Sequence, residues 1–175
     1  RGRRIEYEKY TPYSGNVTAG GINTCFAAMD HSAVFEFSDA RHFIIDVSRL
    51  SEGQYSDHNP HPGHIDFSSD GYSVSGWNSD LFDGSHTSPK PNFRGYFYIE
   101  FSRPYADFIC SGNDQDKVQG AVTFAEEGPL TARVGLSLIS VEQARANLIR
   151  EVGDRSYRSV LRLARERWAD RKSVV

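Results

Sequence analysis

The chain has 175 residues, of which 38% are hydrophobic, 25% charged and 13% aromatic. This length allows one sizeable hydrophobic core with a short appended segment, and the composition is that of a soluble globular domain. The net charge is −3, but residues 141–175 carry +4 and residues 1–140 carry −7. The acidic first part argues against a nucleic-acid-binding protein, and no apolar run is long enough to span a membrane.

Alternating apolar and polar residues predict eight or nine short strands in the first 139 residues, separated by turn residues. These strands are drawn from ten candidate segments, some weaker than others: Ile5–Lys9, Ile22–Ala28, Ser32–Phe37, His42–Val47, His64–Phe67, Gly71–Gly76, Phe93–Ser102, Tyr105–Cys110, Val118–Ala125 and Ala132–Leu138. Three stretches without such a period are predicted to be irregular: Thr11–Gly21, Ser51–Gly63 and Trp77–Asn92. Short strands without crossover helices indicate an all-β fold, an antiparallel β-sandwich.

The period changes after the last strand, which predicts two C-terminal α-helices. Ser140 can cap the first helix, with Gln143 reaching back in a capping box, and Gly153 suits its end. Apolar residues then recur at helical spacing, first Val141, Ala144, Leu148 and Val152, and later Tyr157, Val160, Leu161, Ala164 and Trp168. We therefore expect a β-sandwich in residues 1–139, incomplete at its N-terminus, followed by a helical linker segment in residues 140–175.

One irregular stretch has the composition of a sugar-binding site. Trp77 offers a flat apolar face for a sugar ring, and Asp80 and His86 follow it with polar groups for the hydroxyls. The same composition also occurs in loops that pack on the edge of a sheet. Both interpretations stay open, with Trp77, Asp80 and His86 as the carbohydrate-binding candidates.

Three histidines at equal spacing, His58, His61 and His64, are the candidate metal ligands. Pro60 and Pro62 keep this segment extended, so the spacing does not bring the rings to one helical face. We therefore prefer a surface loop to a metal site here. Asn113, Asp114 and Asp116 supply oxygen atoms but lack the further ligands of a calcium loop, so we expect a turn.

No catalytic motif assigns a reaction to this chain. Glycoside hydrolysis needs a pair of carboxyl groups, and the sequence does not pair its candidates, Glu36, Asp46, Asp66 and Asp107.

Two cysteines and one sequon are the remaining chemical features. One disulfide between Cys25 and Cys110 is possible. Asn16-Val17-Thr18 is a glycosylation sequon, which is used only in a secreted protein. We expect a secreted or extracytoplasmic protein, and the first residues, RGRR, suggest that an upstream part is missing.

The segment RVGLSLISVEQARANLIREV (Arg133–Val152), followed by YRSVLRLARERWAD (Tyr157–Asp170), resembles one enzyme family. It is similar to the end of the N-terminal β-sandwich of the glycoside hydrolase family 92 α-mannosidases. There a strand reads R-V-G-x-S-x-x-S-V-E-Q-A-R-x-N-L and leads into a helix with a late Trp. GYFYIEFSRPYADF (Gly95–Phe108) resembles an upstream strand and turn of that family. SVSGWNSD and HFIIDVSRL match more loosely.

The resemblance implies a calcium-dependent, inverting, exo-acting α-mannosidase on mannose-containing glycans. In that family the sandwich joins an (α/α)6 barrel through a helical linker, and the barrel holds the catalytic carboxylates and the calcium ligands. The resemblance therefore implies no catalytic residue and no cofactor within this chain.

Two hypotheses follow. In the first, the chain is the non-catalytic sandwich of such a mannosidase, and it acts together with a barrel domain. In the second, it is a stand-alone carbohydrate-binding, lectin-like or otherwise bioactive β-protein without hydrolase activity. A sandwich that has lost its partner would leave the helix stripes exposed, whereas in a stand-alone protein they would fold onto the sheet or form a dimer.

Overall fold

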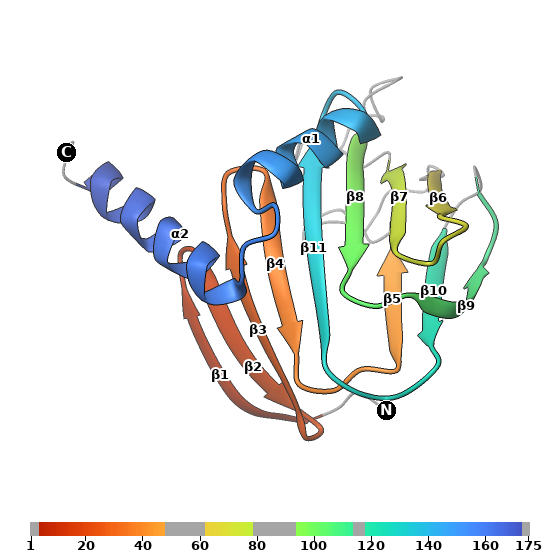
Figure 1. Cartoon of the computed structure of the whole chain (residues 1–175), viewed down its shortest axis with the longest axis horizontal. Coiled ribbons are helices and arrows are strands. Elements are labelled where there is room, and N and C mark those ends of the chain that lie inside the picture. Colours follow the sequence, from red (N-terminus) through yellow and green to blue (C-terminus); the bar gives the residue numbers. More distant parts are fainter. Residues whose placement is uncertain (1–3, 48–61, 79–93, 114–117, 173–175) are drawn as a thin grey trace, which may run out of the picture.

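A computed structural model describes residues 4–47, 62–78, 94–113 and 118–172. Eleven strands and two helices are found within these ranges, and all strand pairs are antiparallel. The strands are β1 Ile5–Thr11, β2 Ser14–Ala19, β3 Ile22–Ala28, β4 Ser32–Phe37, β5 His42–Asp46, β6 Gly63–Phe67, β7 Ser73–Asn78, β8 Gly95–Phe101, β9 Tyr105–Cys110, β10 Gln119–Phe124 and β11 Leu130–Ser137. The helices are α1 Val141–Glu151 and α2 Tyr157–Lys172 (Figure 1).

The strands form a large and a small sheet, which confirms the predicted β-sandwich. The large sheet has the order β1-β2-β3-β4-β11-β8-β7-β6, and the small sheet has the order β5-β10-β9. Apolar side chains from both sheets meet in one core, in which Phe101, Phe124 and Val122 are almost completely buried. Each such side chain contributes about 1.5–3 kcal/mol relative to an exposed one. This core fixes the small sheet against one face of the large sheet.

The two helices cover part of the other face of the large sheet (Figure 1). Ala27 and Val34 of the sheet pack there against Leu148, Val152 and Val160 in a second buried cluster. Helix α1 lies over β11, β8 and β4, and α2 lies over β3 and β4. No helix in the described part of the chain is long and apolar enough to cross a membrane. The predicted helix stripes thus fold onto the sheet, although Trp168 remains 36% exposed.

Both ends of α1 form as predicted, apart from one side chain. The Ser140 hydroxyl accepts from the backbone N–H of Gln143 at 3.1 Å, and Gly153 ends the helix with a φ of 52°. The Gly153 N–H donates to the Leu148 carbonyl at 2.9 Å. The Gln143 side-chain amide donates to Asn147 at 3.0 Å, in place of the expected bond back to the cap. The capping box is therefore only half formed.

The prediction that Thr11–Gly21 is a loop was wrong, because β2 occupies most of this segment. Gly20 and Gly21, with φ values of 59° and 78°, form a two-residue hairpin turn that needs a positive φ at both positions. Gly15 lies inside the strand because the Phe26 ring covers it: a Cβ there would come within 2.3 Å of that ring. Close packing, and not a turn, explains this third glycine.

The other two irregular stretches were predicted slightly too long. Gly63 belongs to β6, and Trp77 and Asn78 belong to β7. Apart from Pro62, the rest of both stretches lies outside the described residues, as do Asp80, His86, His58 and His61. The division into a sandwich up to residue 139 and a helical linker from residue 140 stays a prediction.

Candidate functional site

A row of aromatic side chains crosses the large sheet on the face opposite the sandwich core. Ile65, Val74 and Phe97 are buried in the core, so their strand neighbours of opposite parity point away from it. His64 of β6 pairs with Trp77 of β7, which pairs in turn with Tyr96 of β8. We call His64, Trp77 and Tyr96 the aromatic row. All three are partly exposed.

The indole of Trp77 is contacted from both neighbouring strands. The His64 ring lies parallel to it within 9°, at a centroid distance of 6.2 Å. The Arg94 guanidinium, just before β8, lies 3.8 Å from the Trp77 ring centroid in a cation–π contact, worth about 0.5–1 kcal/mol at an exposed site. His64 Nε2 lies 3.1 Å from Asp66 Oδ1. The row thus combines apolar ring surface with donors and acceptors for hydroxyl groups.

Helix α1 borders the aromatic row. Arg145 of α1 lies over the Tyr98 ring at 5.7 Å, and Arg133 of β11 pairs with Glu100 at 3.9 Å. Both contacts lie on the same face of the sheet as the aromatic row, between the row and the part of the sheet that α1 covers.

The structure describes one of the three histidines that were candidate metal ligands. His64 lies in the aromatic row, while the other two histidines are outside the described residues. Within the described ranges, no group of three His, Cys, Asp or Glu side chains could hold a metal ion. The Asn113 side-chain amide bonds to the backbone of Ile65 as a neighbouring strand would. Its Oδ1 accepts from the Ile65 N–H at 2.7 Å, and its Nδ2 donates to the Ile65 carbonyl at 2.9 Å. Its oxygen is thus already bonded to the edge strand β6.

The four candidate carboxylates lie on separate elements. Glu36 is on β4 and Asp66 on β6, in the large sheet, whereas Asp46 and Asp107 are on the small sheet. Asp46 pairs with Gln119 and Asp107 with Thr123, at opposite ends of β10. This arrangement offers no pair that faces one reacting bond.

The two cysteines are free and lie on different sheets, so the possible disulfide is not formed. Cys25 is enclosed by polar side chains between the sheet and α2. Burial raises the pKa of its thiol, and the nearby Glu36 carboxylate raises it further, while a hydrogen bond with Tyr157 opposes them. A raised pKa disfavours the thiolate, so Cys25 is not an activated nucleophile.

Asn16 of the sequon belongs to the polar cluster around Cys25. Its Nδ2 donates to Cys25 Sγ at 3.2 Å, and its Oδ1 accepts from Asn23 at 2.8 Å. Nδ2 is the atom to which a glycan would be attached, and in the folded chain it is engaged with the sulfur.

Two buried polar residues of α1 fasten the helix to the sheet. Asn147 donates to the Leu136 carbonyl at 2.9 Å. Glu151, with its side chain 4% exposed, accepts from the His31 N–H at 2.9 Å and from the Ser32 hydroxyl at 2.7 Å. Burial raises the pKa of Glu151, but these hydrogen bonds outweigh it and hold the pKa below its ordinary value. The carboxylate therefore stays charged at neutral pH.

The glycine of the RVGLS segment, Gly135, is needed for the packing of α1 on β11. A Cβ on this residue would lie 2.1 Å from the Ala144 carbonyl oxygen, so only glycine lets α1 approach β11 this closely. Ser140, Asn147 and Gly135 thus have roles in the architecture and not in chemistry.

The family model for the glycosyl hydrolase family 92 N-terminal domain matches residues 4–137. The chain belongs to glycosyl hydrolase family 92. An inverting mannosidase of the family from Bacteroides thetaiotaomicron is 28% identical, with a TM-score of 0.73 over 93% of this chain and 22% of that one. The family 92 hydrolase ccman5 is 20% identical, with a TM-score of 0.72 over 95% and 25%.

A family 92 α-mannosidase from Bacteroides thetaiotaomicron has the same fold, with 14% identity and a TM-score of 0.70 over 95% of this chain and 24% of that one. No curated protein sequence matches the chain. The chain spans about a quarter or less of the length of the three solved mannosidases and hydrolases named above. At 20% and 14% identity, the last two likenesses show the fold alone.

Sequence reasoning named Trp77 as a carbohydrate-binding candidate and His64 as a metal candidate, and it named neither Arg94 nor Tyr96. Tyr96 was predicted within a strand, and its pairing with Trp77 depends on the register of β7 and β8. No local pattern gives this register, so the row could not be assembled from sequence.

Proposed function

We propose that this chain is the N-terminal sandwich domain of a calcium-dependent, inverting exo-α-mannosidase that acts on mannose-containing glycans. The observation that carries the proposal is the family match over residues 4–137, supported by 28% identity to an inverting mannosidase over 93% of the chain. In this proposal the catalytic carboxylates and the calcium ligands lie in an (α/α)6 barrel outside this chain. The described residues do not offer a calcium site, so no step is assigned to calcium here.

The role proposed for the sandwich is to contact the mannoside and not to cleave it. Inversion needs two carboxyl groups about 6.5–9.5 Å apart with a water between them. Glu36, Asp46, Asp66 and Asp107 are distributed over both sheets, which supports a non-catalytic role.

The aromatic row is the proposed contact surface. Sugar rings combine apolar C–H faces with hydroxyl groups, which suits aromatic rings flanked by charged donors and acceptors. Arg94 lies over Trp77, and its guanidinium carries five N–H donors in a fixed plane. None of the hydrogen bonds among the described residues uses these donors. Asp66, beside His64, supplies an acceptor at the other end of the row.

Tryptophan fluorescence tests this role. In a Trp168→Phe variant only Trp77 emits, and we expect its emission to change saturably with methyl α-mannopyranoside. Arg94→Gln should weaken binding about tenfold, the size expected for a lost charge-assisted hydrogen bond, whereas Arg158→Gln, an exposed residue of α2, should have no effect. An unchanged Trp77 emission would contradict the contact surface.

A second candidate function is a stand-alone, lectin-like protein. The observation that favours it is that both helices already cover the sheet, with Leu148 2% exposed and Val160 fully buried. A secreted or extracytoplasmic location, glycosylation at Asn16 and self-association through the helices belong to this proposal. Glycan-array binding without mannose release from the whole protein would favour it, and mannose release by the whole protein would exclude it.

A further inference from the structure

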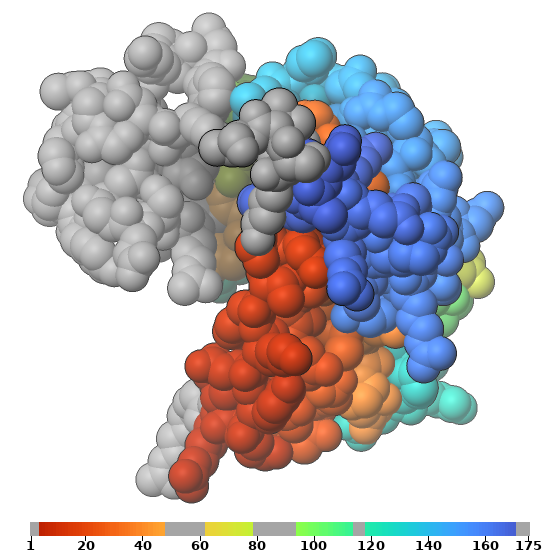
Figure 2. All heavy atoms as spheres, turned by 90° about the vertical axis from the view of Figure 1, so that its left-hand side faces the viewer, coloured from red at the N-terminus to blue at the C-terminus, as the bar shows by residue number. Residues whose placement is uncertain are grey.

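A basic groove lies between α2 and the first hairpin, at the opposite end of the large sheet from the aromatic row. Figure 2 shows α2 (dark blue) beside the first strands (red). The groove has a volume of about 480 Å³, which is within the roughly 300–1,000 Å³ of ligand sites. No acidic side chain is found among the described residues that line it. The lining includes four basic residues and two tyrosines: Lys9, Arg158, Arg162, Arg165, Tyr13 and Tyr157.

The three arginines of the groove lie in a line along α2. Arg158, Arg162 and Arg165 follow one another at i, i+4 and i+7, which places them on one face of the helix. The first and the last are about 10 Å apart along the helix axis, at 1.5 Å per residue. All three are exposed, and the exposed Lys9 lines the groove from β1. One small ion cannot contact basic groups spread over this distance, whereas a polymer with repeated negative charges can.

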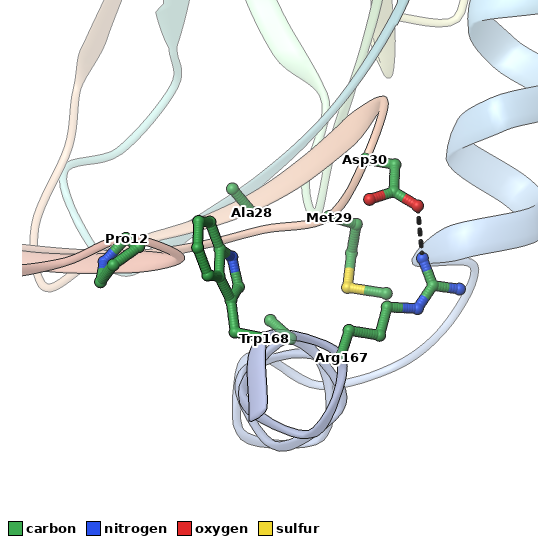
Figure 3. Close-up of a pocket in the computed structure, with 7 residues that line it drawn as sticks. Pro12, Ala28, Met29, Asp30, Arg167 and Trp168 are labelled. Atoms are coloured by element: carbon green, nitrogen blue, oxygen red, sulfur yellow. Dashed lines mark hydrogen bonds and ion pairs between the residues drawn. The ribbon is translucent and has the colours of Figure 1, made fainter. Parts of the chain in front are cut away.

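The positive charge of the groove is less neutralised than that on the neighbouring side of α2. There Arg167 donates to Asp30 at 2.9 Å, and Figure 3 shows this ion pair near Trp168, where the helix meets the sheet. Of the four basic side chains in the groove, only Arg162 forms an ion pair within the described part of the chain, with Glu166 at 2.8 Å. The groove therefore has a positive potential that attracts anionic ligands.

The residue types in the groove suit a charged sugar polymer. The planar guanidinium of arginine can bind two oxygen atoms of an oxyanion at once. The rings of Tyr13 and Tyr157 offer apolar surface to the C–H faces of sugar rings. Nucleic acid is a poorer match, because residues 1–140 carry a net charge of −7 and would repel a long duplex on either side of the groove.

We propose that this groove binds a segment of an anionic polysaccharide, with the charged groups of the polymer on Arg158, Arg162 and Arg165 and its sugar faces against the two tyrosines. The site would hold the protein on a charged glycan surface and would not select a bond for cleavage. The proposal does not depend on the function proposed above, because it involves neither the aromatic row nor a mannoside.

The test uses fluorescein-labelled heparin, a sulfated polysaccharide, and the whole chain of 175 residues. The anisotropy of the label should rise saturably with protein, and the affinity should fall as the salt concentration rises. Labelled dextran, which is neutral, should not bind. Arg158→Gln and Arg165→Gln should each weaken heparin binding about three- to tenfold, the size expected for one exposed charge-assisted contact.

Arg167→Gln is the matched control. It removes the same charge from the same helix, but Arg167 pairs with Asp30 and does not line the groove. The affinity for heparin should therefore stay that of the parent. Because all three arginines are exposed, the circular dichroism spectra of the variants should also be those of the parent.

Three results would overturn the proposal. The first is an unchanged anisotropy with heparin. The second is equal weakening by Arg167→Gln, because net charge alone would then attract the polymer. The third is equally tight binding of single-stranded DNA or polyglutamate, which would assign the groove to a different class of polyanion. The mannoside titration of Trp77 uses a neutral ligand, so failure of one proposal is distinguishable from failure of the other.

Discussion

The two helices lie on the same face of the large sheet, but they are attached to it differently. Helix α1 is held by the buried side chains of Asn147 and Glu151 and by the close approach at Gly135. Helix α2 packs through Val160 and Ala164, and its outer end is tied by the half-exposed pair of Arg167 and Asp30. The difference indicates that α1 is held more firmly than α2, whose outer end carries partly exposed polar and aromatic side chains.

Truncation of the apolar contact of each helix should give the largest contrast. Leu148→Ala removes a side chain that is 2% exposed and should lower the free energy of unfolding by about 2–5 kcal/mol. Leu161→Ala, at a partly buried position of α2, should cost clearly less. Urea unfolding followed by circular dichroism measures both. Equal losses would contradict the different attachment of the two helices.

The close approach of α1 to β11 can be broken at Gly135. Gly135→Ala places a Cβ against the Ala144 carbonyl, which is backbone and cannot rotate away. We expect a loss of about 1–3 kcal/mol, the usual cost of overpacking. Gly95→Ala is the control, because its Cβ would meet only the movable Asn78 side chain. A Gly135 variant as stable as the control would show that α1 is not fixed at this distance.

The buried carboxylate of α1 should make stability depend on pH. The pKa of Glu151 is lowered in the folded state, so its contribution is present above its ordinary value near 4.5 and is lost as the pH falls below it. The unfolding temperature of the parent should therefore approach that of Glu151→Gln as the solution is acidified from pH 7. A difference between the two that stays constant or grows on acidification would contradict the lowered pKa.

The smallest effect on stability is expected at the pair that ties α2. Arg167→Gln removes an ion pair that is half exposed, and such pairs contribute about 0–1 kcal/mol. The thermal unfolding temperature should therefore change little. A large loss of stability would mean that this pair serves the architecture as Glu151 does.

The sequence predicted most of the fold because local signals were clear. Ile22–Ala28, Ser32–Phe37 and Tyr105–Cys110 match β3, β4 and β9 residue for residue, and the caps of α1 were correct at Ser140 and Gly153. The segment of β2 was missed because three glycines suggested a loop. One of them, Gly15, lies within a strand, where the Phe26 ring leaves no room for a Cβ. Only the tertiary structure reveals this contact.

The candidate sites were harder to predict because they depend on register and on distant segments. Trp77 was chosen from composition, but its contact with Arg94 crosses from β7 to the start of β8. Asp30 and Arg167 are separated by 137 positions. Trp168 was predicted only as part of the helix stripe. Such groups meet through the packing of α2 on the sheet, which the helical period alone does not specify.

The central claim is that this chain contacts mannosides without cleaving them. The most direct test incubates the chain with an α-linked mannobiose and follows tryptophan emission and free mannose in the same sample. The account predicts a saturable change in emission and no mannose release above the buffer control. Release of mannose by this chain alone would contradict it, because two carboxyl groups of this chain would then have to form a catalytic pair.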